Sequence, residues 1–380
     1  MVQREVAHVF VPGVHQQRLR APAFLLPYAM GAGAIAATLI AWAAFSARPT
    51  HTDSPLAAVA AVSLSDVRSV AYTAPSGGRD VGYTRAIDGA GGPRALASFP
   101  YALNFHARGE ASPTADTLAL LTVSDIATLS ARLTLVAVRD ARRHEIDASF
   151  DYLSEIAWSP DGRRLALVHS ATPAAFTVSE VNAATRSAVP VARFEDAFLV
   201  APVGYSMDGD RLYMVVIDQS GSTLWVVRNG RAQRAGLLSP GRTRDWVLSP
   251  DGARLAFIAV LGSGTPAFAG RTMSIATGAV TSAPGVADQV GAAWHPSTGT
   301  ARFGGPGGSI KLSTPGEREA YVVPAQWSPD GSTLVAAVYS APADADGNGT
   351  ESIEVMTPDY RVRLAEEADA RFLGWVLNVE

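Results

Sequence analysis

From Ser65 to the end of the chain, apolar and polar residues alternate in short runs that are separated by turn residues. Examples are RLALV at residues 164–168, RLAFIAV at 254–260 and TLWVVR at 223–228. Alternation with a period of two is typical of strands with one buried face, and no apolar repeat of about 3.6 residues competes with it. Each unit orders four such strands, which predicts a four-stranded antiparallel meander.

One turn recurs along the chain and divides it into repeats. Trp158 is followed by Ser-Pro-Asp-Gly, and related turns occur in YSMDGDRLYMVV, VLSPDGARLAFIAV, WHPSTGTARF and WSPDGSTLVAAV, with ASPTADTLALLTV as a degenerate copy. Successive copies lie 47 residues apart from Asp161 to Asp208 and 43 apart from Asp208 to Asp251. A period of this length with four strands per repeat predicts the blades of a β-propeller and excludes helical solenoids.

Backbone conformation explains the composition of this turn. Pro160 fixes φ at the second turn position, and Gly162 suits a left-handed conformation. Ser159 and Asp161 can accept hydrogen bonds from nearby amides. The turn thereby sets the register of the next strand, and Trp158 is expected to fill the wedge between neighbouring blades.

The segments WSPDGRRLALV, LSPDGARLAFI and WSPDGSTLVAAV resemble the WD40-like (PD40) repeats of TolB-type propellers, which also occur in the propeller domains of prolyl-oligopeptidase-like enzymes. The resemblance covers about residues 65–380. It implies a propeller fold and leaves the function open, because one propeller fold hosts many activities. Met207, Thr117 and the Ser297-Thr298-Gly299 variant depart from the repeat, which weakens single turns without breaking the series.

The two ends of the repeat region are expected to share one blade. RFLGWVLN near the C-terminus reads as a first strand that ends in Trp375, and residues 68–99 supply the second, third and fourth strands. Their pairing closes the ring and removes open edges. With the six internal turns, this predicts an all-β, seven-bladed β-propeller. Six or eight blades are the alternatives, because the sixth unit, TARFGGPGGSIKLST, is short and rich in glycine.

An apolar segment precedes the repeats. Residues 21–47 carry no charge, and they are longer than the roughly 20 residues that a spanning helix needs. We predict a retained transmembrane helix, with a cleaved signal peptide as the alternative. Arg4, Arg18 and Arg20 lie before the segment and only Arg48 lies close behind it, so the N-terminus is expected in the cytoplasm.

This orientation divides the chain into four parts. They are a short cytoplasmic N-terminus (residues 1–20), the transmembrane helix or signal anchor (21–47), a linker (48–64) and an extracytoplasmic propeller (65–380). The expected location is therefore the membrane, with a single pass and the propeller outside the cytoplasm.

Composition and charge narrow the classes of partner and chemistry. The net charge is −4 and the isoelectric point is about 6.0, so no positive field favours nucleic acid and none is expected as a partner. The chain has no cysteine, which excludes disulfides, thiolate metal sites and cysteine nucleophiles. No Gly-x-Ser-x-Gly motif is present and the sequence leaves no room for a catalytic α/β domain after the repeats, so a hydrolase of that kind is not expected.

The resemblance implies that loops from fourth to first strands, and from second to third strands, share one mouth of the central channel. Aromatic residues beside charges in those segments suit a recognition surface, although the same side chains could pack between blades or stay solvated. The candidate binding residues are Tyr101, Asp151, Tyr152, Glu195, Asp196, Arg242, Arg244, Asp245, Asp288, Asp369 and Arg371.

One loop has the spacing of a calcium site. Asp344, Asp346 and Asn348 stand two residues apart in DADGNGTES, with Gly349 after them. Three oxygen-bearing side chains could converge there on a hard cation. However, the position of the bidentate glutamate in an EF-hand is taken by Val355, and ordinary hairpin chemistry explains the same residues. No cofactor is expected apart from this Ca²⁺ alternative.

Two hypotheses for function follow. The first is a membrane-anchored propeller that binds protein partners at the membrane or acts as a scaffold within an envelope assembly, with the lipid bilayer contacted through residues 21–47. The second is a propeller enzyme or a small-ligand or sugar-binding sensor that uses the central channel. We favour the first, since no pair of carboxylates or histidines stands out as catalytic.

Overall fold

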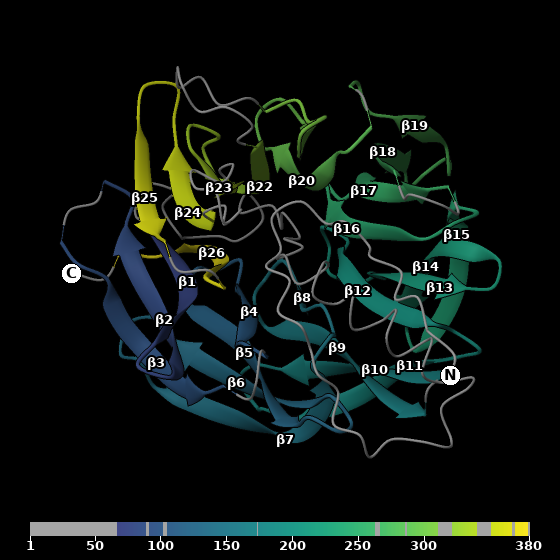
Figure 1. Cartoon of the computed structure of the whole chain (residues 1–380). Coiled ribbons are helices and arrows are strands. Elements are labelled where there is room, and N and C mark those ends of the chain that lie inside the picture. Colours follow the sequence, from purple (N-terminus) through teal and green to yellow (C-terminus); the bar gives the residue numbers. More distant parts are fainter. Residues whose placement is uncertain are drawn as a thin grey trace, which may run out of the picture.

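The computed structural model describes residues 67–88, 91–101, 105–172, 174–262, 267–285, 287–310, 321–339, 351–366 and 369–378. In these residues every regular element is a β-strand, and the strands form sheets arranged in a ring (Figure 1). The all-β propeller that the alternating pattern predicts is therefore confirmed.

Six of the sheets contain four antiparallel strands each. In chain order they are β1 (Ser69–Ser76), β2 (Arg79–Ala86) and β3 (Arg94–Pro100) together with β26 (Arg371–Val376); β4 (Arg108–Ala111), β5 (Thr117–Asp125), β6 (Ser130–Ala137) and β7 (Arg143–Asp151); β8 (Ala157–Trp158), β9 (Arg164–Thr172), β10 (Ala175–Asn182) and β11 (Ala188–Glu195); β12 (Leu199–Tyr205), β13 (Leu212–Asp218), β14 (Gly221–Arg228) and β15 (Arg231–Ser239); β16 (Thr243–Leu248), β17 (Arg254–Leu261), β18 (Ala267–Ser274) and β19 (Val280–Ser282); and β22 (Tyr321–Trp327), β23 (Leu334–Tyr339), β24 (Glu351–Met356) and β25 (Arg361–Ala365).

The predicted count of seven complete blades is wrong, because the described residues form six four-stranded blades. Between β19 and β22 lies a sheet of two strands, β20 (Val290–His295) and β21 (Thr300–Gly304). The chain turns back after β21 at Gly305, whose φ is 89°. The Ser309 amide then donates to the Phe303 carbonyl at 2.8 Å. This bond occupies the β21 edge where a third strand would pair.

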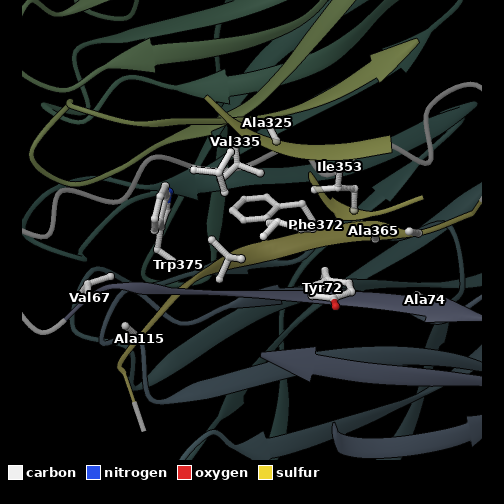
Figure 2. Packing of buried hydrophobic residues seen from close by; sticks show 14 residues of the cluster. Val67, Tyr72, Ala74, Ala115, Ala325, Val335, Ile353, Ala365, Phe372 and Trp375 are labelled. Atoms are coloured by element: carbon white, nitrogen blue, oxygen red, sulfur yellow. The ribbon is translucent and has the colours of Figure 1, made fainter. Parts of the chain in front are cut away.

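The ring is closed by the last strand, as the sequence predicts. β26 pairs antiparallel with β1, with Val70 opposite Trp375 and Thr73 opposite Arg371. Trp375 and Phe372 pack against Val335 and Ile353 of the sheet formed by β22–β25 (Figure 2). The C-terminal strand therefore completes the first blade and seals it against the last one.

Large aromatic side chains fill the wedges between neighbouring sheets. Trp158 and Trp294 are fully buried. The indole N–H of Trp158 donates to the Glu110 carbonyl at 3.4 Å, and that of Trp294 donates to the Val247 carbonyl at 2.9 Å. Each bond reaches the first strand of the preceding sheet, so each tryptophan joins two sheets as well as filling space.

The recurring turn has the hydrogen bonds that its sequence predicts. The Arg164 amide donates to Ser159 Oγ at 2.9 Å, and the Arg163 amide donates to Asp161 Oδ1 at 3.1 Å. Ser159 Oγ in turn donates to Asp161 Oδ1 at 2.6 Å, and Gly162 has a φ of 68°. The Ser-Asp pairs 206/208, 249/251 and 328/330 repeat this geometry.

These turns predict a loss of stability in acid. The Ser206 hydroxyl holds the pKa of Asp208 below its usual value. Burial alone would raise the pKa of Asp161, Asp251 and Asp330, but hydrogen bonds from the preceding serine and a backbone amide outweigh it and lower each pKa. A depressed folded pKa gives stability above the unfolded value of about 3.9, which is lost as the pH falls through the folded pKa.

We therefore expect the urea midpoint to fall steeply below about pH 4. Replacing all four aspartates with asparagine keeps an oxygen acceptor in the turn and removes the titration. The midpoint of that variant should depend less on pH between about 5 and 2. Parallel curves for the two proteins would contradict the assignment.

Candidate functional site

The ring has two faces, because the ends of antiparallel strands alternate. The loops from fourth to first strands and from second to third strands form one face, which we call the mouth face. The Ser-Asp turns and the loops from third to fourth strands form the other, which we call the turn face. All eleven candidate binding residues lie in mouth-face loops or at the strand ends beside them. Their position is as expected, whereas their role in binding stays a prediction.

His106 is the centre of a polar cluster on the mouth face. Its Nδ1 lies 2.7 Å from Asp80 Oδ1, and its Nε2 lies 3.4 Å from Asp369 Oδ2. The Ala107 amide also donates to Asp80 Oδ2 at 2.6 Å. A carboxylate can only accept, so the short bond to Asp80 places the proton on Nδ1 and turns Nε2 toward the exposed Asp369.

Two of the predicted aromatic residues support this histidine. The Tyr101 ring lies 4.6 Å from the His106 ring, centroid to centroid. The Tyr152 hydroxyl donates to the His106 carbonyl at 2.6 Å. Burial raises the pKa of Tyr152, and the Arg371 and Arg108 charges oppose that shift. Tyr101, Tyr152 and Asp369 thus come from three separate loops to one place, beside Arg371 at the start of β26.

A second set of bonds holds the loop that carries Tyr152. Arg108 Nη1 donates to the Tyr152 carbonyl at 2.9 Å, and Arg108 Nη2 lies 3.4 Å from the Glu155 carboxylate. Arg108 and Glu155 are both buried. A paired buried charge fixes the loop, because breaking the pair would leave an uncompensated charge out of water.

Sequence reasoning missed Asp80, His106, Arg108 and Glu155. One signal could have found His106, since it is the only histidine in a segment that joins a fourth strand to a first strand. No comparable signal marks Asp80, which lies in β2 and meets His106 only through the fold.

The candidates Arg244 and Asp245 form a buried ion pair. Arg244 Nη2 lies 3.1 Å from Asp245 Oδ1, and the two side chains are 1% and 5% exposed. Asp245 has a φ of 53°, and its Oδ2 accepts the Gly291 amide of the next sheet at 2.9 Å. Arg244 and Asp245 therefore stabilise the packing beneath the mouth face and are not part of its exposed surface.

Asp151 is also partly buried. It accepts the Ser170 amide at 2.8 Å and the Ser170 hydroxyl. Burial raises the pKa of Asp151, although the Ser170 bonds oppose the shift. The carboxylate joins β7 to β9 across two neighbouring sheets, so its main contact is structural.

The remaining candidates are exposed. Arg193 donates to Glu195 at 2.6 Å. Asp196, Asp288 and Asp369 share a left-handed backbone, with φ values of 56°, 72° and 78°, a conformation that aspartate tolerates better than most residues do. Arg242 is also exposed. These side chains are available to a partner that approaches the mouth face.

The calcium prediction is not tested, because Asp344, Asp346 and Asn348 lie outside the described residues. Among the residues that the structure does describe, no three histidines, aspartates or glutamates are placed to hold a metal ion. The predicted transmembrane segment also lies outside them. No helix within the described part of the chain is long and apolar enough to cross a bilayer.

No protein-family model matches the sequence, and no curated protein sequence matches it. Solved structures match the fold. The β-propeller domain of the Trilobed protease from Pyrococcus furiosus aligns with a TM-score of 0.53 and 11% identity over 79% of this chain and 95% of that chain. An oligogalacturonate lyase in complex with manganese aligns with a TM-score of 0.53 and 11% identity over 77% and 87%.

TolB from Acinetobacter baumannii is also similar, with a TM-score of 0.48 and 16% identity. The alignment covers 80% of this chain and spans 65% of that TolB chain. The two alignments with TM-scores of 0.53 confirm the propeller fold that the resemblance to TolB-type repeats implies. At these identities the structures establish a β-propeller and nothing finer.

Proposed function

We propose that the protein is a membrane-anchored, extracytoplasmic propeller that binds a protein partner through its mouth face. One observation carries the proposal. Tyr101, Ile126 and Phe198 are large apolar side chains in three mouth-face loops, and they are 36%, 40% and 37% exposed. Exposed aromatic and aliphatic groups among charges are the composition that protein interfaces favour.

The loops that carry these residues have firm support. Tyr101 packs on His106, which the Asp80 carboxylate holds, and Ile126 follows Asp125, which accepts the Ala127 amide at 2.9 Å. Phe198 donates its backbone amide to the Ile217 carbonyl at 2.7 Å. A surface that is already ordered loses less conformational entropy on binding than a floppy one does.

The test is recovery of partners with the solubilised, tagged full chain. We expect the triple variant Tyr101→Ser, Ile126→Ser, Phe198→Ser to lose at least about 10-fold of partner recovery, since buried apolar anchors dominate interface energies. The matched control is Tyr360→Ser with Met207→Ser, because these exposed residues lie on the turn face. Equal recovery for the two variants would contradict the proposal.

The anchor is tested separately. If residues 21–47 span the bilayer, washing membranes at alkaline pH leaves the protein in the pellet. Release of a soluble form that starts near Ala47 would instead support the cleaved signal peptide.

The cluster around His106 favours a second candidate function, binding of a small polar ligand such as a sugar at the channel. His106 Nε2 and the Asp369 carboxylate would be the groups that contact it. A thermal-shift screen of sugars against wild type and His106→Gln tests this candidate. A ligand that stabilises only the wild type supports it, and the absence of any shift in the wild type argues against it.

A further inference from the structure

Arginines gather on the turn face at the first three sheets of the ring. We define the arginine patch by six residues beside the starts of β1, β3 and β7 and in the loop between β10 and β11: Arg68, Arg94, Arg139, Arg142, Arg143 and Arg186. All are exposed except Arg94, which is half-buried. The arginine patch shares no residue with the proposed partner-binding surface, which lies on the opposite face of the ring.

Hydrogen bonds join the patch across three sheets. Arg94 at the start of β3 donates to the Arg139 carbonyl at 2.8 Å. Arg143 at the start of β7 donates to the Ser98 carbonyl at 3.4 Å. Arg186 Nη2 lies 3.2 Å from His144 Nε2. These bonds hold the arginines together on one continuous surface.

The patch carries a clear excess of positive charge. The acidic residues in and beside these loops are Asp88, Asp140 and the exposed Asp116, whose carbonyl accepts the Val138 amide at 2.8 Å, so six arginines against three aspartates leave a local charge of +3. The Asp140 carboxylate is paired with Arg142, with 2.6 Å between Asp140 Oδ2 and Arg142 Nε. The whole chain has the opposite sign, −4, so this surface is more positive than the molecule as a whole.

The chain enters the propeller at this patch. The first described residue is Val67, and the Arg68 carbonyl accepts the Ile87 amide at 3.0 Å, which places the entry beside the loop that leads to Arg94. Residues 48–66 separate this point from the proposed membrane span. A chain of that length reaches at most about 65 Å.

We propose that the arginine patch docks on the anionic headgroup surface of the bilayer that holds the anchor, and thereby turns the mouth face away from the membrane. This inference rests on the proposed anchor. Guanidinium groups pair with phosphate in two-point geometry. The short tether raises the effective concentration of the headgroups at the patch far above that of any soluble polyanion.

The absence of cysteine allows a direct test, because one introduced cysteine is the only labelling site. Ala184→Cys places a fluorescent donor in the loop of Arg186, and Ala127→Cys places it on the mouth face; both alanines are exposed. The full chain is reconstituted in vesicles that carry an acceptor on the headgroups. The vesicles contain phosphatidylcholine alone or with phosphatidylglycerol, and an impermeant reagent labels only outward-facing propellers.

With phosphatidylglycerol, we expect the efficiency of energy transfer from position 184 to be at least about twice that from position 127. Addition of 0.5 M NaCl should remove the difference, because it shortens the electrostatic screening length to a few ångströms. The quadruple variant Arg139→Gln, Arg142→Gln, Arg143→Gln, Arg186→Gln should lose it at low salt, whereas the corresponding lysine variant should keep most of it. Phosphatidylcholine alone should give equal transfer.

Equal transfer from the two positions with anionic lipid overturns the docking proposal while leaving the anchor intact. Release of the protein by alkali overturns the anchor. In that case the labelled protein is added to preformed vesicles, and the difference in energy transfer between positions 184 and 127 decides whether the patch binds headgroups. If soluble polyphosphate, added in charge excess, changes the fluorescence at position 184 and anionic vesicles do not, the occupant is a soluble polyanion and the docking proposal is wrong.

Discussion

Replacing Trp375 with alanine is expected to lower the free energy of unfolding by about 3–5 kcal/mol. The indole is buried in the seam where the closing strand meets the last complete blade (Figure 2). Removing it leaves a cavity that rigid β-strands on both sides can only partly collapse. Urea unfolding followed by near-UV circular dichroism measures the change.

Trp375→Phe is the matched variant. The indole nitrogen of Trp375 has no hydrogen-bond partner among the described residues, so phenylalanine removes volume without leaving a polar group unpaired. Its cost should be about 1–2 kcal/mol. Tyr360→Ala, at an exposed position, should change stability by less than about 0.5 kcal/mol. An alanine variant at position 375 as stable as the wild type would show that the seam does not hold the ring closed.

Replacing Asp245 with alanine is expected to cost a similar amount, about 3–5 kcal/mol, because it leaves the buried Arg244 charge without this carboxylate. It also removes the acceptor of the Gly291 amide, which ties β16 to β20. Alanine at a left-handed backbone position adds strain. Thermal unfolding and urea midpoints both report the loss.

Asp288→Ala is the control, since Asp288 has the same left-handed backbone but an exposed side chain. It should cost about 1 kcal/mol, the price of the conformation alone. Asp245→Asn, which keeps the conformation and the side-chain oxygen, should fall between the two alanine variants. If both alanine variants cost the same, the ion pair adds nothing and backbone strain explains the result.

Local signals account for most of the fold that could be predicted. The Ser-Asp-Gly turn forms its hydrogen bonds within six residues, so its local sequence predicts both the turn and the register of the next strand. The strand predicted around Trp375 has no other strand after it to pair with, which is why its pairing with the first strands of the repeat region could be inferred. The two-stranded sheet could not, because the backbone of Gly305 and the Ser309 bond decide it.

The candidate site was harder to predict because its contacts are far apart in sequence. His106 meets Asp80 from β2 and Asp369 from the loop before β26, and no spacing rule links such positions. Burial was equally hidden. Arg244 and Asp245 look like surface charges in a loop sequence, yet packing against the next sheet places them inside. The repeat pattern predicts on which face these residues lie, whereas their burial depends on packing between sheets that are far apart in sequence.

The shared blade also constrains how the molecule is made. β1, β2 and β3 leave the ribosome early, but their first strand is Arg371–Val376, near the end of the chain. Until that strand emerges, β1 keeps an unpaired edge that could bind another nascent chain. Translation that stops before Arg371 should therefore yield aggregation-prone chains in place of a smaller propeller.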